Sequence, residues 1–171
     1  MSAVLAQHGR LQRVIERMQS RIQVIEWSPE WLDQALPIMR EMHANSIYAD
    51  MPLNEKKVIF QLSASGILVP DRYFRIAVLD GEGLGAFYGC VQRTFFNDML
   101  VALDMGWWVK KEARGSMAAP LLLADFERWA LSMGAKKVCV AQSTAVNIAT
   151  TTKLFEACGY RVTGSNTVKD L

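Results

Sequence analysis

The chain has 171 residues, of which 51% are hydrophobic and 21% charged, which suits one domain with a core of ordinary size. Its net charge of +2 argues against nucleic acid or an anionic membrane as a general partner. No stretch approaches the ~20 apolar residues of a membrane span, and charges interrupt the apolar residues at the N-terminus, unlike a secretory signal. We therefore expect a cytoplasmic protein with a single domain over residues 1–171.

The cysteines and histidines give no sign of a metal site. Cys90, Cys139 and Cys158 lack metal-ligand spacing, and each lies in an apolar stretch, so we expect reduced thiols packed in the core. His8 and His43 are the only histidines and lie far apart in the sequence.

The N-terminal part begins with a helical pattern. Apolar residues recur near helical spacing over residues 3–20 with charges between them, which predicts an amphipathic helix. A short strand is expected over residues 22–27. The helix would be an addition to the domain, and its apolar side is a candidate surface for a protein partner or a second copy of the chain.

Two more helices are expected next. Ser28 provides an N-cap and Pro29 a first-turn proline for a helix that runs to about His43, with a kink at Pro37. After a loop, a further helix is expected over residues 54–65.

The middle of the chain changes to the alternation of strands. Residues 73–79, 84–96 and 99–109 read as three strands, and a tight turn over residues 80–83 joins the first two. Short connections of this kind make an antiparallel meander.

The last part alternates helix and strand. We expect a helix over residues 114–133, a buried strand over 137–142, a helix over 148–158, and one or two edge strands in the tail, 160–171. A meander followed by strand, helix and strand predicts an α/β (α+β mixed) domain, with a mixed, mostly antiparallel sheet flanked by helices.

The connection between the strand that ends at Val109 and the next helix has the composition of an anion site. Gly115 and small residues lie in it, and Lys110, Lys111 and Arg114 add positive charge. The first amides of a helix have no intrahelical partners and lie at the positive end of its dipole, so small side chains let a phosphate approach them. The pattern alone also fits a purely structural turn.

Two segments resemble a known family. The run VKKEARGSMAAPLLL, residues 109–123, is similar to the acetyl-coenzyme A (acetyl-CoA) signature of the GNAT acetyltransferases, a strand ending in Val, an Arg/Gln-x-x-Gly-x-Gly/Ala turn and a leucine-rich helix. The run NIATTTKLFEACGY, residues 147–160, resembles the family's penultimate helix, which ends Leu-Tyr-Glu-x-x-Gly-Phe. The resemblance implies the GNAT fold with an extra N-terminal helix, acetyl-CoA as co-substrate, and a primary amine as acetyl acceptor.

The resemblance carries cofactor contacts onto the end of the strand and the turn. They fall on Trp108, Val109, Arg114, Gly115, Ser116, Met117, Ala118 and Ala119. Met117 departs from the pattern, because it stands at the first glycine position. Its side chain would lie near the cofactor unless it turns into the core, and the turn would then serve packing alone.

A second departure lies in the later helix. Phe155 stands where many family members have a tyrosine that protonates the leaving thiolate, so that role is vacant and only a cofactor contact is implied. Ser143, Thr144 and Asn147 lie near the same end and could substitute directly or through water. The threonines at 150–152 are alternatives, and Asn147 is also a candidate cofactor contact.

Asp104 is the candidate general base, because family members commonly place a carboxylate on the corresponding strand and it is the only acid in 99–109. Strand alternation puts it on one face with Ala102, Gly106 and Trp108. Apolar neighbours should raise the pKa of its carboxyl, which suits a base. A paired or exposed aspartate is the alternative, and Glu82 and Glu112 are weaker candidates because they lie in turns.

The resemblance places the acceptor pocket between the first two helices and the last strands. The expected lining comes from His43, Tyr48, Asp50, Met51 and residues 95–98, whose acidic members would suit an amine. The tryptophan side chains are interpreted as core.

Two functions follow. The first is acetyl transfer from acetyl-CoA to a primary amine of a small molecule or protein. The alternative is a catalytically degenerate GNAT-fold binding or structural protein, such as a phage virion or host-interaction component, which Met117 and Phe155 would fit. The fold by itself does not decide between them.

Overall fold

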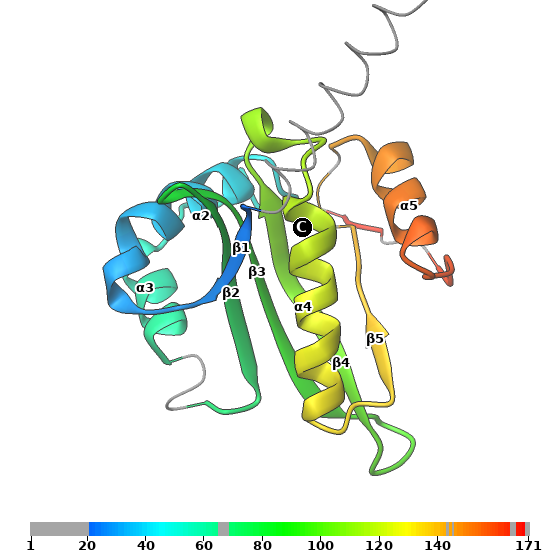
Figure 1. Cartoon of the computed structure of the whole chain (residues 1–171). Helices are drawn as coiled ribbons and strands as arrows, with labels where there is room; N and C mark the ends of the chain where they lie inside the picture. Colours follow the sequence, from blue (N-terminus) through cyan, green and yellow to red (C-terminus); the bar gives the residue numbers. More distant parts are fainter. Residues whose placement is uncertain (1–20, 65–68, 143, 145, 165–166, 170–171) are drawn as a thin grey trace, which may run out of the picture.

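A five-stranded sheet forms the centre of the computed structural model, which describes residues 21–64, 69–142, 144, 146–164 and 167–169 (Figure 1). The strands are β1 (Gln23–Glu26), β2 (Arg72–Leu79), β3 (Glu82–Arg93), β4 (Leu100–Val109) and β5 (Lys137–Cys139), in that spatial order. The first four are antiparallel, and β5 runs parallel to β4. The predicted meander and mixed sheet are confirmed. The helix predicted over residues 3–20 lies outside the described residues.

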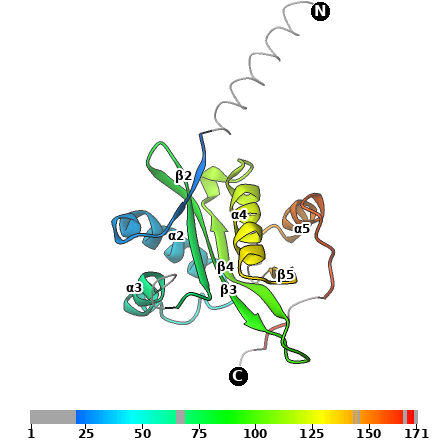
Figure 2. The ribbon, with the colours of Figure 1, turned by 60° about the horizontal axis from the view of Figure 1, so that its bottom comes forward.

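Helices cover both faces of the sheet. Figure 2 shows α2 and α3 on one side, and α4 and α5 on the other. Their bounds are α2 Leu32–Ala44, α3 Glu55–Ala64, α4 Ala118–Ser132 and α5 Ile148–Ala157, with short 3-10 helices at Pro29–Trp31 and Lys111–Ala113. No helix among the described residues has both the length and the apolar character needed to cross a membrane.

Each face of the sheet has its own core, as the alternation of strand side chains requires. Under α4, the rings of Phe87 and Phe126 stack with centroids 4.3 Å apart. Under α2, Phe74 and Trp108 pack with Ile38. Burying each of these large side chains contributes about 1.5–3 kcal/mol, so the two cores hold β4 firmly between the helix layers.

Gly89 of β3 allows α4 to lie close to the sheet. A Cβ at this position would come within 2.5 Å of Cε2 of Phe126, so no larger residue fits without movement of that ring. Gly89 pairs with Asp104 of β4, and the close approach of α4 therefore occurs beside the candidate base.

Several predicted boundaries are wrong. Ser28 makes no side-chain cap, because its hydroxyl donates to Glu30 at 2.9 Å and a 3-10 turn begins there. The helix predicted from residue 114 begins at Ala118, after a turn over residues 114–117. The strand predicted over 137–142 ends at Cys139.

The predicted edge strands of the tail are also absent from its described residues, 160–164 and 167–169. Val162 and Val168, the apolar residues that an edge strand would bury, are 67% and 64% exposed. Without a buried face, nothing favours pairing over a solvated chain.

The predicted core packing of the cysteines holds only for Cys90, which is buried in β3. Cys139 and Cys158 are exposed, and all three thiols are free. Cys139 faces solvent because β5 is the edge strand and turns Val138 inward to the core. The described residues contain no group of three or more acidic, histidine or cysteine side chains that could hold a metal ion.

Candidate active site between two diverging strands

The site begins where β4 and β5 separate. The two strands pair from Val101 with Lys137 to Leu103 with Cys139. Beyond this point the Asp104 carboxylate accepts a hydrogen bond from the Ala141 amide at 2.9 Å, in place of a main-chain pairing. The rest of β4 has no strand partner on this edge within the described residues. Unpaired main-chain groups at such an edge are free to bind an extended ligand.

A β-bulge shapes the same part of β4. Tyr88 pairs with Gly106 and Gly89 with Asp104, so Met105 is an extra residue in the strand. The bulge overturns the predicted shared face. Ala102 packs in the core under α4, whereas Trp108 packs in the core under α2. Asp104 therefore keeps its alternation with Ala102 only.

A cleft of about 210 Å³ opens between the diverging strands. Eight residues predicted for the site line it, namely Asp104, Trp108, Val109, Arg114, Gly115, Ser116, Ala119 and Asn147. The volume is below the ~300–1,000 Å³ of most ligand pockets. A large ligand would place only a narrow arm inside it.

The turn before α4 carries main-chain amides beside this cleft, two of them in the lining residues Gly115 and Ala119. The N–H groups of Gly115, Met117 and Ala119 have no acceptor among the described residues, whereas the Ala118 amide donates to the Ser116 hydroxyl at 3.2 Å. Gly115 has a φ of +84°, a conformation that favours glycine. Free amides at a helix start are the arrangement that binds phosphate.

Arg114 supplies the positive charge beside these amides. Its guanidinium lies 4.7 Å from the centre of the Trp108 ring, and its Nε donates to the Val109 carbonyl at 3.3 Å. Glu41 of α2 approaches the same group, with Oε1 3.9 Å from Nη2. Sequence reasoning missed Glu41, because nothing local connects it to a turn about seventy residues later.

Asp104 lines the cleft where β4 and β5 separate. Burial raises the pKa of its carboxyl from 3.8 to about 6, although the hydrogen bond from Ala141 opposes the shift. This is the direction that the apolar neighbours predict. A carboxyl with this pKa is mostly ionised at neutral pH and is a stronger base than an ordinary aspartate.

The start of α5 forms the opposite wall. Asn147 precedes the helix with φ and ψ both 52°, and its side-chain oxygen accepts a hydrogen bond from the Thr150 hydroxyl at 2.8 Å. The Thr151 hydroxyl donates to the Asn147 carbonyl at 3.3 Å. Both threonines and Thr144 line the cleft, whereas Ser143 lies outside the described residues.

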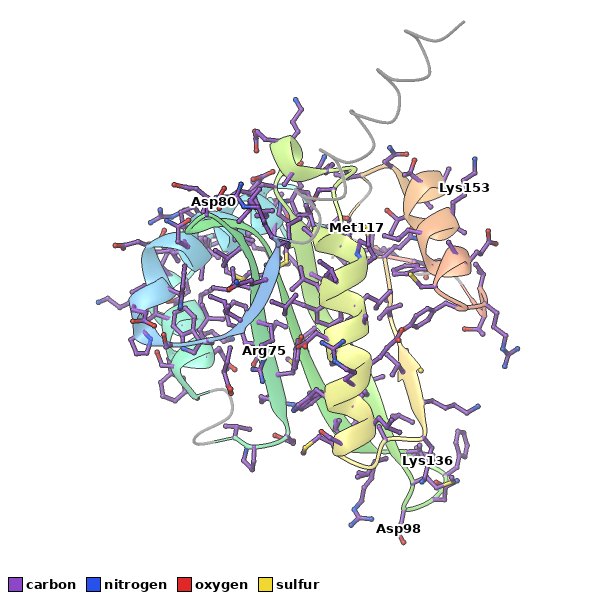
Figure 3. The ribbon with its side chains drawn as sticks, viewed as in Figure 1. Arg75, Asp80, Asp98, Met117, Lys136 and Lys153 are labelled. Atoms are coloured by element: carbon purple, nitrogen blue, oxygen red, sulfur yellow. The ribbon has the colours of Figure 1, made fainter. Side chains whose placement is uncertain are left out.

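None of the residues predicted to line the acceptor pocket, His43, Tyr48, Asp50, Met51 and residues 95–98, is among those that line the cleft. Ser46, which follows α2, makes an isolated bridge with Thr144, which does line it. The hairpin over residues 95–98 is not part of it. Figure 3 shows Asp98 at the opposite end of the sheet from the start of α4, because β4 runs its full length between them. Met42 of α2 lines the cleft instead.

This architecture has counterparts among solved structures. No protein-family model matches the chain, and no curated protein sequence matches it. Solved structures match over almost their whole length. One is the aminoglycoside acetyltransferase AAC(6')-Iy in complex with the bisubstrate analogue CoA-S-monomethyl-acetylneamine, with TM-score 0.70, 15% identity, and coverage of 88% of this chain and 97% of that one.

Two further matches have the same character. A GNAT family acetyltransferase of Staphylococcus aureus has TM-score 0.63 and 15% identity, over 88% of this chain and 99% of its own. The chain has the GNAT fold. A putative acetyl transferase of Pyrococcus furiosus has TM-score 0.64 and 22% identity, over 88% and 99% of the two chains. At these identities the likeness concerns the fold.

Within the GNAT fold, the turn that resembles the signature joins β4 to α4. Met117 directly precedes α4 (Figure 3). It is half-buried and is not among the residues that line the cleft. Its side chain therefore does not block the amides of the turn, although a methionine stands here at a glycine position of the family pattern. Ala118 is fully buried and its amide is already bonded, so it offers the cleft no group.

Phe155 also lies behind the cleft of this GNAT fold rather than in it. Its ring is 7% exposed and stacks on Trp107, with centroids 5.5 Å apart and an interplanar angle of 21°. Trp107 packs against the core under α4, as predicted, and also lines the cleft. Phe155 thus supports the wall of the cleft and is not among the residues that line it. Glu82 and Glu112 border a second cavity and do not line the cleft.

Proposed function

We propose that this protein transfers an acetyl group from acetyl-CoA to a primary amine. The observation that carries the proposal is the cleft, in which free turn amides and Arg114 lie at one end and the Asp104 carboxylate at the other. The first end suits a pyrophosphate and the second suits an amine that must lose a proton. Acetyl-CoA carries a pyrophosphate and a reactive thioester joined by a narrow arm.

The residues fit this co-substrate. The amides of Gly115, Met117 and Ala119 and the guanidinium of Arg114 would hold the pyrophosphate. The unpaired edge of β4 beyond Asp104 would bind the arm, as a strand edge binds a peptide. When bound, acetyl-CoA supplies the acyl carbonyl that an amine attacks.

The acceptor end would be served by Asp104. Its carboxylate would take one proton from the acceptor ammonium, and the neutral amine then forms the new C–N bond as the C–S bond breaks. An amide of the β4 edge would polarise the carbonyl oxygen. The nitrogen loses its second proton as the C–N bond forms, and the Thr150 and Thr151 hydroxyls, or water, would relay a proton to the thiolate, because Phe155 has none to give.

The solved structures named above favour amine acceptors, since one contains an analogue of an acetylated aminoglycoside. We propose a primary amine on a small molecule or a protein as the acceptor. The inactive alternative gains no support from the cleft, because the turn amides have no acceptor within the described part of the chain and Met117 lies outside the lining.

Release of free coenzyme A thiol tests the proposal. Acetyl-CoA is offered with neamine, spermidine and a lysine peptide in turn. Wild type should release thiol faster with at least one amine, and Asp104→Asn should lose about 10²–10⁴-fold of that rate. Asp98→Asn, at the far end of the sheet, is the matched control and should keep it. If Asp104→Asn kept the full rate, Asp104 would not be the base.

A further inference from the structure

Glu41 of α2 contacts the turn before α4, where the pyrophosphate would bind, although Glu41 plays no part in the function proposed above. Its Oε1 accepts a hydrogen bond from the Lys111 amide at 3.1 Å and lies 3.9 Å from Nη2 of Arg114. Its neighbour Met42 lines the cleft. The helix α2, which covers the other face of the sheet from α4, thus places the Glu41 carboxylate beside the Arg114 guanidinium.

This contact and two others hold the Arg114 side chain in place at the edge of the cleft. Its guanidinium packs on the Trp108 ring at 4.7 Å, and its Nε donates to Val109. A cation–π contact and an ion pair each favour this position modestly. To reach a phosphate, the guanidinium must give up at least the contact with Glu41 or share itself between two anions.

We propose that Glu41 is the resident counter-ion of Arg114, and that it competes with the cofactor pyrophosphate for this cation. The inference rests on the proposed function, because it assumes that coenzyme A binds at the turn. Glu41 is then a positioning residue that acts through Arg114. Its charge weakens coenzyme A binding and so favours release of the product after transfer.

The solvent exposure of the two side chains sets the expected size of the effect on coenzyme A affinity. The side chains of Arg114 and Glu41 are 37% and 31% exposed, so solvent and salt screen their attraction. Partly exposed ion pairs of this kind change an equilibrium roughly two- to fivefold. The competition should therefore tune affinity and not abolish binding.

Glu41→Gln separates the charge from the hydrogen bond. The glutamine side-chain oxygen can still accept the Lys111 amide, so the turn keeps its anchor while the competing charge is lost. Glu55→Gln is the matched control, because Glu55 is also a surface glutamate paired with an arginine, but its partner is Arg40 of α2 and not Arg114 of the turn.

The experiment is isothermal titration of wild type, Glu41→Gln, Glu55→Gln, Arg114→Gln and the Glu41→Gln/Arg114→Gln double variant. We expect Glu41→Gln to lower the Kd of coenzyme A and of dephospho-coenzyme A roughly two- to fivefold. Its effect should shrink in high salt and in the Arg114→Gln background. The Kd of pantetheine, which has no pyrophosphate, should not change, and Glu55→Gln should match wild type.

Other outcomes overturn the inference. A weaker affinity in Glu41→Gln would make Glu41 only an anchor of the turn, and an unchanged affinity would remove it from the site. An equal gain for pantetheine would show a general effect on the cleft. If neither wild type nor any variant bound coenzyme A, the proposed function would fall, and this inference with it. Binding by wild type with no change in Glu41→Gln rejects the inference alone.

Discussion

The carboxylate of Asp104 accepts a hydrogen bond from the Ala141 amide at 2.9 Å, at the point where β4 and β5 separate. This one contact replaces the next main-chain pairing of the two parallel strands. It holds the segment after β5 to the base of the cleft, and it leaves the carboxyl partly buried with a pKa of about 6. The same side chain is therefore placed to shape the cleft and to act as a base.

The rate of acetyl transfer should follow the ionisation of Asp104. Because the base must be deprotonated and its pKa is raised to about 6, kcat/KM should rise with pH through this value and level off above it. A pH profile of kcat/KM from pH 5 to 8 measures this. A flat profile across that range would leave Asp104 without a role in proton transfer.

Asp104→Asn should stabilise the fold at neutral pH. The native pKa of about 6 lies above the ordinary 3.8, so burial of the charged form disfavours folding wherever the carboxyl is ionised. This penalty is absent below about pH 4 and complete above about pH 6, where it reaches up to about 3 kcal/mol. Asparagine avoids it and can still accept the Ala141 amide.

Urea unfolding of wild type and Asp104→Asn at pH 4 and pH 8 measures the difference. The variant should be the more stable protein at pH 8, and the gap should narrow at pH 4. An equal gap at both values would show that the charge of Asp104 does not oppose folding.

The location of the turn before α4 is readable from the sequence, because the residues that form it are close together in the chain. A strand end, a glycine and an arginine within a few residues specify a helix start with free amides, as Gly115 and Arg114 show. The mixed sheet is readable for a similar reason, since period and turn residues are local signals. The observed start of this helix, Ala118, nevertheless differs from the predicted start at residue 114.

The shape of the cleft is not readable in this way. The bulge at Met105 and the loss of pairing after Cys139 depend on contacts between β3, β4 and β5 that are distant in sequence. The bulge alone reverses the alternation that placed Asp104 with Trp108. Glu41 and the support of Trp107 by Phe155 are likewise tertiary contacts without a local signal.

Gly115→Ala should weaken coenzyme A binding beyond its effect on stability. Gly115 has a φ of +84°, where an L-residue costs about 1–2 kcal/mol, so the turn should change conformation and misplace its amides. Gly159→Ala is the matched control, since Gly159 has a φ of +85° at the other end of α5 from the cleft and is open to solvent. Denaturation and titration with coenzyme A measure both properties.

Both variants should lose similar stability, and only Gly115→Ala should lose affinity. Equal affinity in the two variants would show that the amides of this turn do not hold the cofactor.

Phe155→Tyr should not restore a general acid. The Phe155 ring is buried against Trp107 and does not line the cleft, so an added hydroxyl should lie among apolar groups. An unpaired buried hydroxyl costs about 1–3 kcal/mol, so we expect lower stability and an unchanged kcat. A higher kcat in Phe155→Tyr would show that this position reaches the leaving thiolate.

The central claim is that the cleft between β4 and β5 binds acetyl-CoA through the turn before α4. Calorimetric titration of wild type with acetyl-CoA, in parallel with Gly115→Ala, tests it most directly. The account predicts saturable binding of one acetyl-CoA per chain, with a clearly higher Kd in the variant. It is contradicted if millimolar acetyl-CoA gives neither binding heat nor a rise in melting temperature, because a ligand of the native state must stabilise it.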